Sequence, residues 1–395
     1  MSGPPIAKAP LSPTSGLNAR VRELLAEGHD ISVLTAGEPP GPPPEHVRAA
    51  AARAAQSPTG HGYGPPAGMP ELRAWVAAAT PAAGDSLDLG NVVVTGGAKS
   101  ALFATFLALL APGDGVLVPT PSWPTYGHAV RLAGGRTLTV PTTSDSGFQP
   151  TVELLDQHHD DAVRLLLLCS PSNPTGAVLA ADRLREIGAW CARHRVTVVL
   201  DQIYGRLGWT DPGRPARAVL REAGADVVVV DGVSKTYAMT GWRIGWLVAP
   251  TPVAGAVTAV LSHTANHPNR IAQTAALAAL EGDQEQVTRL RGHLLDNRAR
   301  LGRTLAAVPD VLDYREPEGG FYAFPSLAPL LAHRPELSDA ATVARMLLDE
   351  AGVAVVPGGS FGAPQHLRVS FVEPAAEFER AVTRMTGYLK TRLRG

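Results

Sequence analysis

The first chemical candidate in the sequence is Lys235, which follows the apolar run 227–230. A continuous apolar run of this length is typical of a strand buried in a parallel sheet, so the lysine is expected at a strand end with few waters around it. Such an amine either pairs with an anion or reacts as a nucleophile once it has lost its proton. The sequence therefore predicts an anion site or a reactive amine at position 235.

Polar groups follow three other apolar runs in the same way. They are Gly96-Gly97-Ala98-Lys99-Ser100 after the run 92–95, Ser170-Pro171-Ser172-Asn173-Pro174-Thr175-Gly176 after the run 165–169, and Asp201-Gln202-Ile203-Tyr204 after the run 196–200. Open α/β sheets bind their ligands at the carboxyl ends of the strands. We therefore expect amide, carboxylate, phenol and amine groups to meet at one edge of a sheet.

Gly96 and Gly97 lead directly into a helix-length segment, whose first backbone N–H groups attract an anion. By itself this signal is weak, because the loop has neither the Gly-x-x-x-x-Gly-Lys-Ser/Thr pattern of nucleotide P-loops nor the Gly-x-Gly-x-x-Gly pattern of dinucleotide folds. Ser234 and Arg243 offer further donors, and the planar guanidinium of Arg243 fits phosphate oxygens.

An anion site beside a strand-end amine suits pyridoxal 5'-phosphate, bound to Lys235 as a Schiff base. Burial and nearby positive charge favour the neutral lysine that an imine requires. Asp201 has the position expected for the partner of the pyridine nitrogen, where a buried carboxylate keeps the ring protonated. Tyr204 and Asn173 are candidate donors to the ring oxygen.

Strand-length and helix-length segments alternate through the middle of the chain. Apolar runs at 92–95, 116–119, 165–169, 196–200, 227–230 and 244–248 alternate with amphipathic segments such as 100–110 and 183–193. This alternation predicts an α/β fold with a mostly parallel sheet sandwiched by helices.

The pattern changes after residue 282. Long charged helices are expected at 285–307 and 339–351, with short strands near Tyr322 and Arg368. We therefore expect residues 1–45 to form an N-terminal arm and part of a small domain, residues 46–282 a large cofactor-binding domain, and residues 283–395 the α+β small domain.

Composition excludes several classes of partner. The 395 residues carry a formal net charge of −1, so no broad field attracts nucleic acid or an anionic membrane. The N-terminus has no apolar signal core and the longest apolar stretch, 101–111, is too short to span a bilayer, which predicts a soluble cytoplasmic protein. Cys169 and Cys191 have no zinc or disulfide spacing, and His158 and His159 have no further ligands, so no metal site is expected.

The ordered motifs resemble those of class I/II aminotransferases, which are fold-type I pyridoxal phosphate enzymes of the aspartate aminotransferase superfamily. The resemblance covers nearly the whole chain and runs through Ala36-Gly37-Glu38-Pro39, Tyr63-Gly64-Pro65-Pro66-Ala67-Gly68, Pro121-Ser122-Trp123-Pro124-Thr125-Tyr126, Asn173-Pro174-Thr175-Gly176, Asp201-Gln202-Ile203-Tyr204, Ser234-Lys235, Gly241-Trp242-Arg243-Ile244-Gly245, Gly319-Gly320-Phe321-Tyr322 and Leu367-Arg368-Val369-Ser370. No single motif is specific, but seven or more in order are. The resemblance implies an aminotransferase with ping-pong kinetics.

The resemblance also implies a role for each matched residue. Lys235 forms the internal aldimine and moves protons, and Asp201 binds the pyridine nitrogen. Tyr204 and Asn173 bind the ring oxygen. Further matches place Trp123 on the ring, Gly97, Ala98, Lys99, Ser234 and Arg243 around the phosphate, Tyr63 in the site of a neighbouring subunit of a homodimer, and Arg368 on the substrate α-carboxylate with help from Gly37 and Asn173.

Substrate choice stays open at this point. Lys99 matches a lysine that in some relatives binds a second, side-chain carboxylate, which suits glutamate and 2-oxoglutarate, whereas other relatives carry the lysine without that preference. Departures from the commoner family pattern at Gln202, Ile203, His61-Gly62 and Gly41-Pro42-Pro43-Pro44 are expected near the entry to the site. They leave the amino-acid specificity undetermined.

Alternative interpretations use the same residues. An identical site supports elimination, replacement or cyclisation of an amino acid in specialised metabolism, because these reactions share a carbanion equivalent. A ligand sensor with a DNA-binding module needs a basic helix-turn-helix segment, which the residues before Gly37 lack. Arg368 could instead pair with Glu373, and Trp123 could be an ordinary core aromatic.

Overall fold

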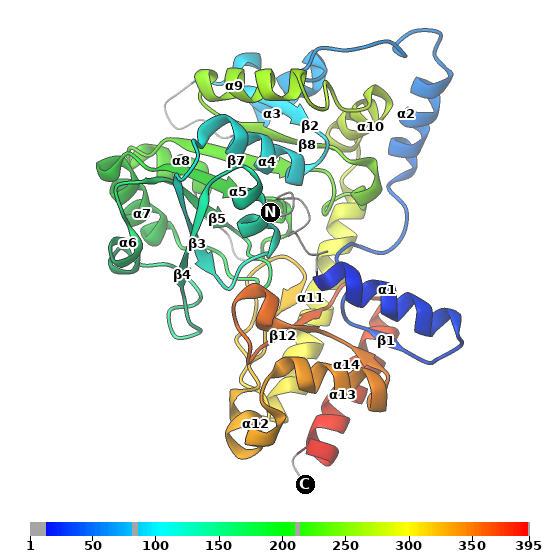
Figure 1. The fold of residues 1–395 in the computed structure, drawn as a ribbon. Coiled ribbons are helices and arrows are strands. Elements are labelled where there is room, and N and C mark those ends of the chain that lie inside the picture. Colours follow the sequence, from blue (N-terminus) through cyan, green and yellow to red (C-terminus); the bar gives the residue numbers. More distant parts are fainter. Residues whose placement is uncertain (1–12, 81–85, 210–213, 394–395) are drawn as a thin grey trace, which may run out of the picture.

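The computed structural model describes residues 13–80, 86–209 and 214–393, and the Pro-rich start of the sequence lies outside these ranges (Figure 1). A seven-stranded sheet dominates the fold, with the strand order β2-β8-β7-β6-β5-β3-β4. Its strands are β2 (Val92–Thr95), β3 (Gly115–Thr120), β4 (Arg136–Pro141), β5 (Val163–Cys169), β6 (Thr197–Asp201), β7 (Val227–Gly232) and β8 (Gly245–Val248). Five of the apolar runs named above overlap these strands, and the run 92–95 coincides with β2.

Strand directions bring the chemical groups to one edge of the sheet. All neighbours are parallel except at β8, which runs antiparallel to β2 and to β7. β2 therefore runs in the same direction as β5, β6 and β7, and the carboxyl ends of these four strands lie at the same edge. The predicted mostly parallel sheet is confirmed.

Helices cover both faces of this sheet, because both faces of its strands are apolar. Along β7, Val227 and Val229 pack into one core cluster, whereas Val228 and Val230 pack into another. The first cluster lies under α2 (Glu45–Gln56), α3 (Pro70–Ala79), α6 (Val152–His158), α7 (Ala181–His194), α8 (Ala216–Glu222) and α10 (Arg270–Glu281). The second lies under α4 (Ala98–Leu109), α5 (Thr125–Leu132) and α9 (Thr251–Ser262).

The edge strand β4 has no counterpart among the predicted strands. Of its six residues only Val140 is fully buried, and Arg136, Thr139 and Pro141 are exposed. A strand with one exposed side and one neighbour lacks the continuous apolar run of the central strands. The sequence pattern therefore gives no signal for it.

A smaller α+β unit packs below the large sheet in Figure 1 and holds its own core cluster. Its helices are α1 (Pro13–Ala26), α11 (Glu285–Ala306), α12 (Ala328–His333), α13 (Ala340–Ala351) and α14 (Ala375–Tyr388), and its strands are β1 (Ser32–Val33), β9 (Tyr322–Ala323), β10 (Val353–Ala354), β11 (Val356–Pro357) and β12 (Leu367–Ser370). β1 pairs in parallel with β10, so the N-terminal segment does return to this unit. The domain boundaries at 45/46 and 282/283 stay a prediction.

Short turns of helix complete the elements. They are η2 (Leu89–Asn91), η3 (Gly205–Leu207), η4 (Thr240–Trp242), η5 (Pro335–Leu337), η6 (Gly358–Phe361) and the π-helical turn η7 (Leu389–Leu393). Within the described ranges, no helix is long and apolar enough to cross a membrane.

One segment, residues 34–44, joins the two units across the edge of the large sheet, and we refer to it as the strap. At its start, the Leu34 N–H donates to the Ala354 carbonyl at 2.9 Å, and the Leu34 carbonyl accepts from Ser370 N–H at 2.8 Å. At its end the chain enters α2, which packs against α10 of the large unit. The strap therefore passes between the small unit and the large unit at the edge where the strand ends meet.

Candidate active site

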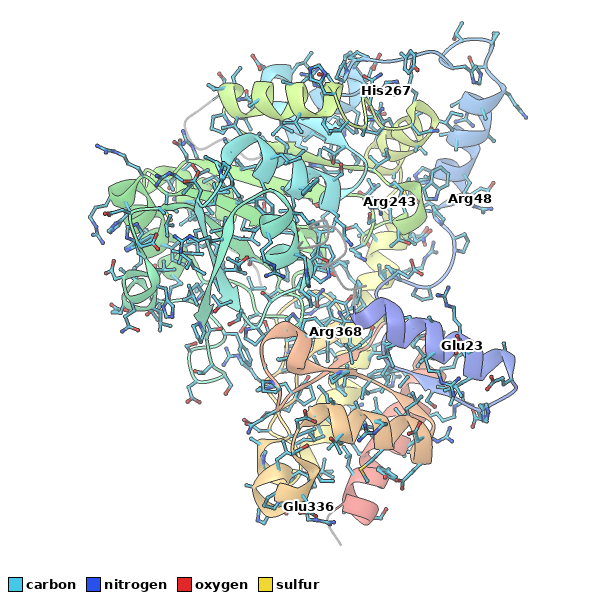
Figure 2. The ribbon with its side chains drawn as sticks, viewed as in Figure 1. Glu23, Arg48, Arg243, His267, Glu336 and Arg368 are labelled. Carbon is cyan, nitrogen blue, oxygen red and sulfur yellow. The ribbon has the colours of Figure 1, made fainter. Side chains whose placement is uncertain are left out.

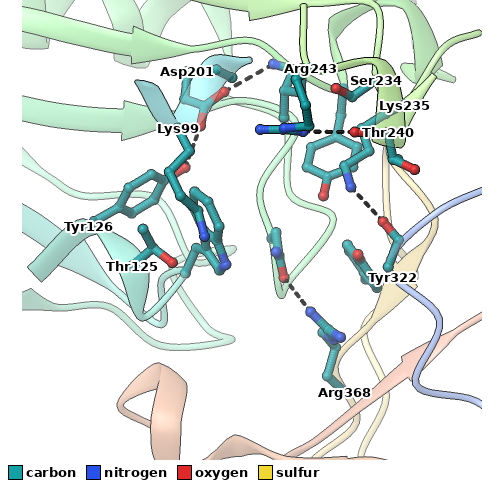
Figure 3. A pocket seen from close by; sticks show the side chains of 16 residues that line it. Lys99, Thr125, Tyr126, Asp201, Ser234, Lys235, Thr240, Arg243, Tyr322 and Arg368 are labelled. Carbon is teal, nitrogen blue, oxygen red and sulfur yellow. Dashed lines mark hydrogen bonds between the residues drawn. The ribbon is translucent and has the colours of Figure 1, made fainter. Parts of the chain in front are cut away.

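A cavity of about 400 Å³ opens at the carboxyl ends of β2, β5, β6 and β7 (Figure 3). It has the size of an ordinary small-molecule site. The structure brings together the predicted residues Gly37, Ala98, Lys99, Trp123, Asn173, Asp201, Tyr204, Ser234, Lys235, Arg243 and Arg368 in its lining. Of the predicted set, Gly97 and Tyr63 lie outside the lining. Five lining residues were not predicted: Thr125, Tyr126, Ile203, Thr240 and Tyr322.

Lys235 projects into this cavity from the loop after β7. Its Nζ donates a hydrogen bond to the Gly37 carbonyl at 2.5 Å (Figure 3). Burial lowers the pKa of the Lys235 amine from 10.5 to about 8; the Glu38 and Asp201 carboxylates oppose this shift, and the Arg368 and Arg243 charges add to it. An appreciable fraction of the amine is therefore neutral near pH 8, as nucleophilic attack or proton abstraction requires.

Asp201 ends β6 at the buried floor of the site. The Tyr126 hydroxyl donates to its Oδ2 at 2.8 Å, and the Ile203 N–H donates to its Oδ1 at 3.1 Å. Burial raises the pKa of the carboxyl, while these two hydrogen bonds and the Lys235 charge oppose the rise. A buried carboxylate with a fixed orientation can hold a cationic or N–H group of a ligand.

Tyr126 was missed because an aromatic residue in an amphipathic helix is typical of a core position. It is buried on α5, and burial followed by the nearby Asp201 charge raises the pKa of its phenol. The phenol therefore stays protonated and donates its hydrogen to Asp201. Its ring also meets Trp123 edge to face, with centroids 5.4 Å apart.

The start of α4 and Arg243 form an anion cradle. Gly97 precedes α4 with φ +92° and caps it without a side-chain hydrogen bond. The Ser100 N–H donates to the Gly97 carbonyl at 3.0 Å, which leaves the N–H groups of Ala98 and Lys99 for a ligand. A Cβ atom at Gly97 would collide with the Arg243 guanidinium. Arg243, itself at φ +57°, donates to the Thr240 carbonyl at 2.8 Å and to the Gly96 carbonyl at 3.2 Å. Ser234, buried nearby, adds a hydroxyl to the lining.

Arg368 enters the cavity from the small unit, on β12. In Figure 2, Arg368 lies on the small unit and Arg243 on the large unit. The Arg368 Nη1 donates to Asn173 Oδ1 at 3.1 Å and its Nη2 donates to the Thr35 carbonyl at 3.3 Å, while its buried Nε has no partner. The guanidinium carbon lies 4.2 Å from the centroid of the Tyr322 ring. Within the part of the chain that the structure describes, no carboxylate forms an ion pair with Arg368, so the alternative pairing with Glu373 is wrong.

Lys99 and Trp123 form another wall of the cavity. The Lys99 Nζ lies 4.9 Å from the centroid of the Trp123 ring. Burial, and then the Arg243 charge, lowers the pKa of the Lys99 amine. An anionic ligand group would offset both effects and favour the ammonium form. Trp123 is partly buried and faces the cavity, so it is not an ordinary core aromatic.

Tyr63 lies outside the cavity on a loop of the large unit, with 90% of its surface exposed. The loop is held by His267, whose Nε2 accepts from the Gly64 N–H at 2.8 Å, and the Tyr63 and His267 rings meet edge to face at 6.1 Å. Figure 2 shows His267 at the end of the large unit that is remote from the small unit. Within one chain, Tyr63 therefore takes no part in the site.

Other nucleophiles and metal ligands contribute nothing to the cavity. Burial raises the pKa of both the Cys169 and the Cys191 thiols to about 12, so neither is a thiolate near neutral pH. Among the residues that the structure describes, no group of three His, Cys, Asp or Glu side chains could hold a metal ion. The charged and titratable groups that line the cavity are thus two lysine amines, two guanidinium groups, one buried carboxylate and phenols.

Known proteins resemble this chain over nearly its whole length. A family model described as aminotransferase class I and II matches residues 29–385. The chain is 40% identical over 381 residues to an aspartate aminotransferase of Streptomyces avermitilis, covering 95% of this chain and 93% of that relative. It is 32% identical to an asparagine–oxo-acid transaminase of Streptococcus mutans, covering 96% of each chain. A structure of aspartate aminotransferase from Thermus thermophilus with maleate has a TM-score of 0.89 and 36% identity, covering 98% of this chain and 100% of that one.

Proposed function

The chain belongs to the class I and II aminotransferase family, and on that premise we propose that it moves the amino group of a dicarboxylic amino acid, aspartate or glutamate, to a 2-oxo acid. Enzymes of this family use pyridoxal phosphate, so the predicted family, the transaminase activity and the cofactor are confirmed. The dicarboxylic substrate and the individual residue roles belong to the proposal.

The observation that carries the proposal is the pair of cations Arg368 and Lys99, which line one cavity from two different units. Arg368 presents a planar fork, as an α-carboxylate requires. Lys99 offers a point charge on another wall, and a second carboxylate would restore its full protonation. The Streptomyces avermitilis relative is named for a dicarboxylic amino acid, and the Thermus thermophilus structure contains the dicarboxylate maleate.

The residues present fit pyridoxal phosphate. Ser234, Arg243 and the N–H groups at the start of α4 would hold the phosphate in the cradle that a Cβ at Gly97 would fill. Asp201 would hold the pyridine N–H, and the Lys235 Nζ would hold the cofactor covalently. Tyr204 and Asn173 would bind the ring oxygen, with Trp123 against the ring face. When bound, the cofactor supplies an electron-withdrawing ring that stabilises the charge left at the substrate α-carbon.

The protein's own part in the reaction is to bind, orient and move one proton. Arg368, held by Asn173 and Thr35, orients the α-carboxylate. Lys235, whose pKa is lowered, takes the proton from the substrate α-carbon on its Nζ and gives it up again later in the reaction. Tyr126 keeps Asp201 oriented by donating its hydroxyl hydrogen.

Activity with chosen donors tests the proposal. We expect the purified protein with pyridoxal phosphate to convert aspartate and 2-oxoglutarate to oxaloacetate and glutamate, with parallel double-reciprocal plots typical of ping-pong kinetics. A Lys99→Ala variant should lose the preference for aspartate over alanine by about 10-fold or more, because one charged contact is removed. Equal use of alanine and aspartate by the native protein would contradict the dicarboxylic substrate. Catalytic release of ammonia without any 2-oxo acid would instead favour elimination.

We also propose that the active form is a homodimer in which Tyr63 enters the site of the partner subunit. The support is a large aromatic side chain that is 90% exposed, on a loop held in place by the hydrogen bond between Gly64 and His267. Exposed aromatic residues on ordered loops are typical of interface positions. Light scattering coupled to gel filtration should give twice the chain mass of 41.3 kDa.

A further inference from the structure

The strap contacts the large unit at two consecutive residues, Gly37 and Glu38. The Gly37 carbonyl accepts the hydrogen bond from the Lys235 Nζ at 2.5 Å. The Glu38 carboxylate accepts a hydrogen bond from the Thr240 hydroxyl, on the turn η4. The strap is thus fastened to the large unit at the residue directly after the one that meets the reactive amine.

The same turn holds Arg243. The Thr240 carbonyl accepts a hydrogen bond from the Arg243 Nη1 at 2.8 Å, and Figure 3 shows Thr240, Arg243 and Lys235 close to one another at one side of the cavity. Glu38, Thr240 and Arg243 therefore form a continuous chain of hydrogen-bonded groups from the strap to the anion cradle.

Four charged groups act on the Lys235 amine from different elements. Glu38 comes from the strap, Asp201 from β6, Arg243 from the residue after η4, and Arg368 from β12. Burial dominates and lowers the pKa of Lys235 to about 8. Among the charges, the Glu38 carboxylate is the strongest influence and acts in the opposite direction to the two arginines. Glu38 is nevertheless exposed, so its carboxylate stays charged without the free-energy penalty of desolvation that a buried carboxylate has.

We propose that Glu38 is a positioning residue, which fastens the strap to Thr240 and so holds the Gly37 carbonyl against the Lys235 amine. This inference rests on the proposed role of Lys235 as the reactive group. Glu38 touches neither the substrate nor the cofactor in this assignment, because it acts through the strap and through its charge.

The chain is well suited to a direct test, since it contains only four lysines, Lys8, Lys99, Lys235 and Lys390. Competitive labelling of the cofactor-free protein with trace acetic anhydride between pH 6 and pH 10, followed by mass spectrometry, gives the protonation midpoint of each amine. We expect Glu38→Gln to move the Lys235 midpoint to lower pH by about half a unit to one unit, as loss of a carboxylate charge near a partly buried amine requires. Glu45→Gln, at the exposed start of α2, is the matched control and should leave the midpoint unchanged.

A second variant separates fastening from charge. Thr240→Val removes the hydroxyl donor and keeps the Glu38 charge. Both Glu38→Gln and Thr240→Val should increase hydrogen exchange in peptides that cover residues 34–44, and Glu38→Gln should move the Lys235 midpoint further than Thr240→Val does. Gel filtration and thermal unfolding of each variant confirm that it is folded.

An unchanged Lys235 midpoint in folded Glu38→Gln protein, or unchanged exchange in the strap, would overturn the inference. Either result would leave the proposed function intact as long as the native protein still shows an absorption band with pyridoxal phosphate that Lys235→Ala abolishes. Absence of that band in the native protein would instead refute the proposed function, whatever the labelling shows.

Discussion

The Arg368 guanidinium is anchored on both terminal nitrogens, by Asn173 and by the Thr35 carbonyl, and each nitrogen keeps a second hydrogen for a ligand. A lysine at this position has all three donors on one nitrogen and lacks the planar fork that binds both oxygens of a carboxylate. We therefore expect Arg368→Lys to lower kcat/KM for aspartate about 100-fold, with the cofactor absorption band unchanged. Steady-state kinetics measure the effect, and Arg345→Lys on the exposed side of α13 is the control. A loss of cofactor binding would show that Arg368 has a different role.

Asp231 is a second acid near the site, partly buried toward the end of β7. Burial raises the pKa of its carboxyl from 3.8 to about 7, and the Asp201 charge also raises it, whereas the Gly232 N–H bond and the Arg206 charge oppose the rise. The folded state thus binds more protons than the unfolded state between about pH 4 and pH 7, so this group's contribution to stability is lost as the pH rises through that window.

The corresponding variant is Asp231→Asn, which keeps the shape of the side chain and cannot ionise. We expect the Tm of this variant to exceed that of the native protein by more at pH 8 than at pH 5.5. At pH 8 the free energy of unfolding of the variant should be higher than that of the native protein by about 1–2 kcal/mol. Asp182→Asn, whose side chain is 90% exposed, should show no such pH dependence. The same Tm difference at both pH values would contradict the assigned pKa.

Residue types and spacing could predict most of the candidate site but not the contacts between its members. Lys235, Asp201 and Asn173 each follow an apolar run, and that local pattern is visible in the sequence. The Tyr126 bond to Asp201 and the Glu38 bond to Thr240 join positions 75 and 202 residues apart. Such bonds depend on how helices and loops pack, for which one sequence carries no periodic signal.

At the scale of elements, the start of α4 illustrates why the glycine loop tolerates little change. Gly97 has φ +92° and lies against the Arg243 guanidinium, whereas a Cβ atom at Gly96 would lie 3.9 Å from its nearest neighbour, the Ser100 Cβ. A side chain at Gly97 would strain the backbone by about 1–3 kcal/mol and displace Arg243. We expect Gly97→Ala to weaken pyridoxal phosphate binding at least about 10-fold, as measured by absorbance titration.

Gly96→Ala is the matched neighbour for this comparison. It adds the same methyl group one residue earlier, in ordinary van der Waals space and without a positive φ. Its cofactor affinity should remain much closer to that of the native protein. Equal losses in the two variants would mean that the loop responds to any added side chain rather than to the position of Arg243.

Central strands and long helices were predictable because their patterns are strong. The runs at 92–95 and 227–230 lie within β2 and β7, and the helices expected at 285–307 and 339–351 match α11 and α13 to within one residue at each end. β4 was not predicted, because an edge strand with exposed residues resembles a loop. The antiparallel direction of β8 was also not predictable, since an apolar run has no direction.

At the scale of the whole molecule, Tyr63 lies outside the cavity of its own chain. Dimers that combine two different variants can therefore test whether Tyr63 acts in the site of the partner subunit. We expect Lys235→Ala homodimers to be inactive and Tyr63→Ala homodimers to be impaired. A heterodimer of the two variants, isolated with two affinity tags, should recover about half of the native turnover per dimer, because one of its two sites then has both residues. If Tyr63 acted within its own subunit, neither site would be complete and no recovery would occur.

The parallel pairing of β1 with β10 has a consequence for the order in which the protein is built. Ser32 and Val33 leave the ribosome early, yet their partners Val353 and Ala354 are made only after every strand of the large sheet. The last strand of the large sheet in the sequence, β8, ends at Val248, so this sheet can assemble before β10, the partner of β1, has been synthesised. The start of the strap, where the Leu34 N–H bonds the Ala354 carbonyl, would then be fixed only once β10 has been synthesised. A chain truncated before that strand would carry the sheet with the strap held at its α2 end alone.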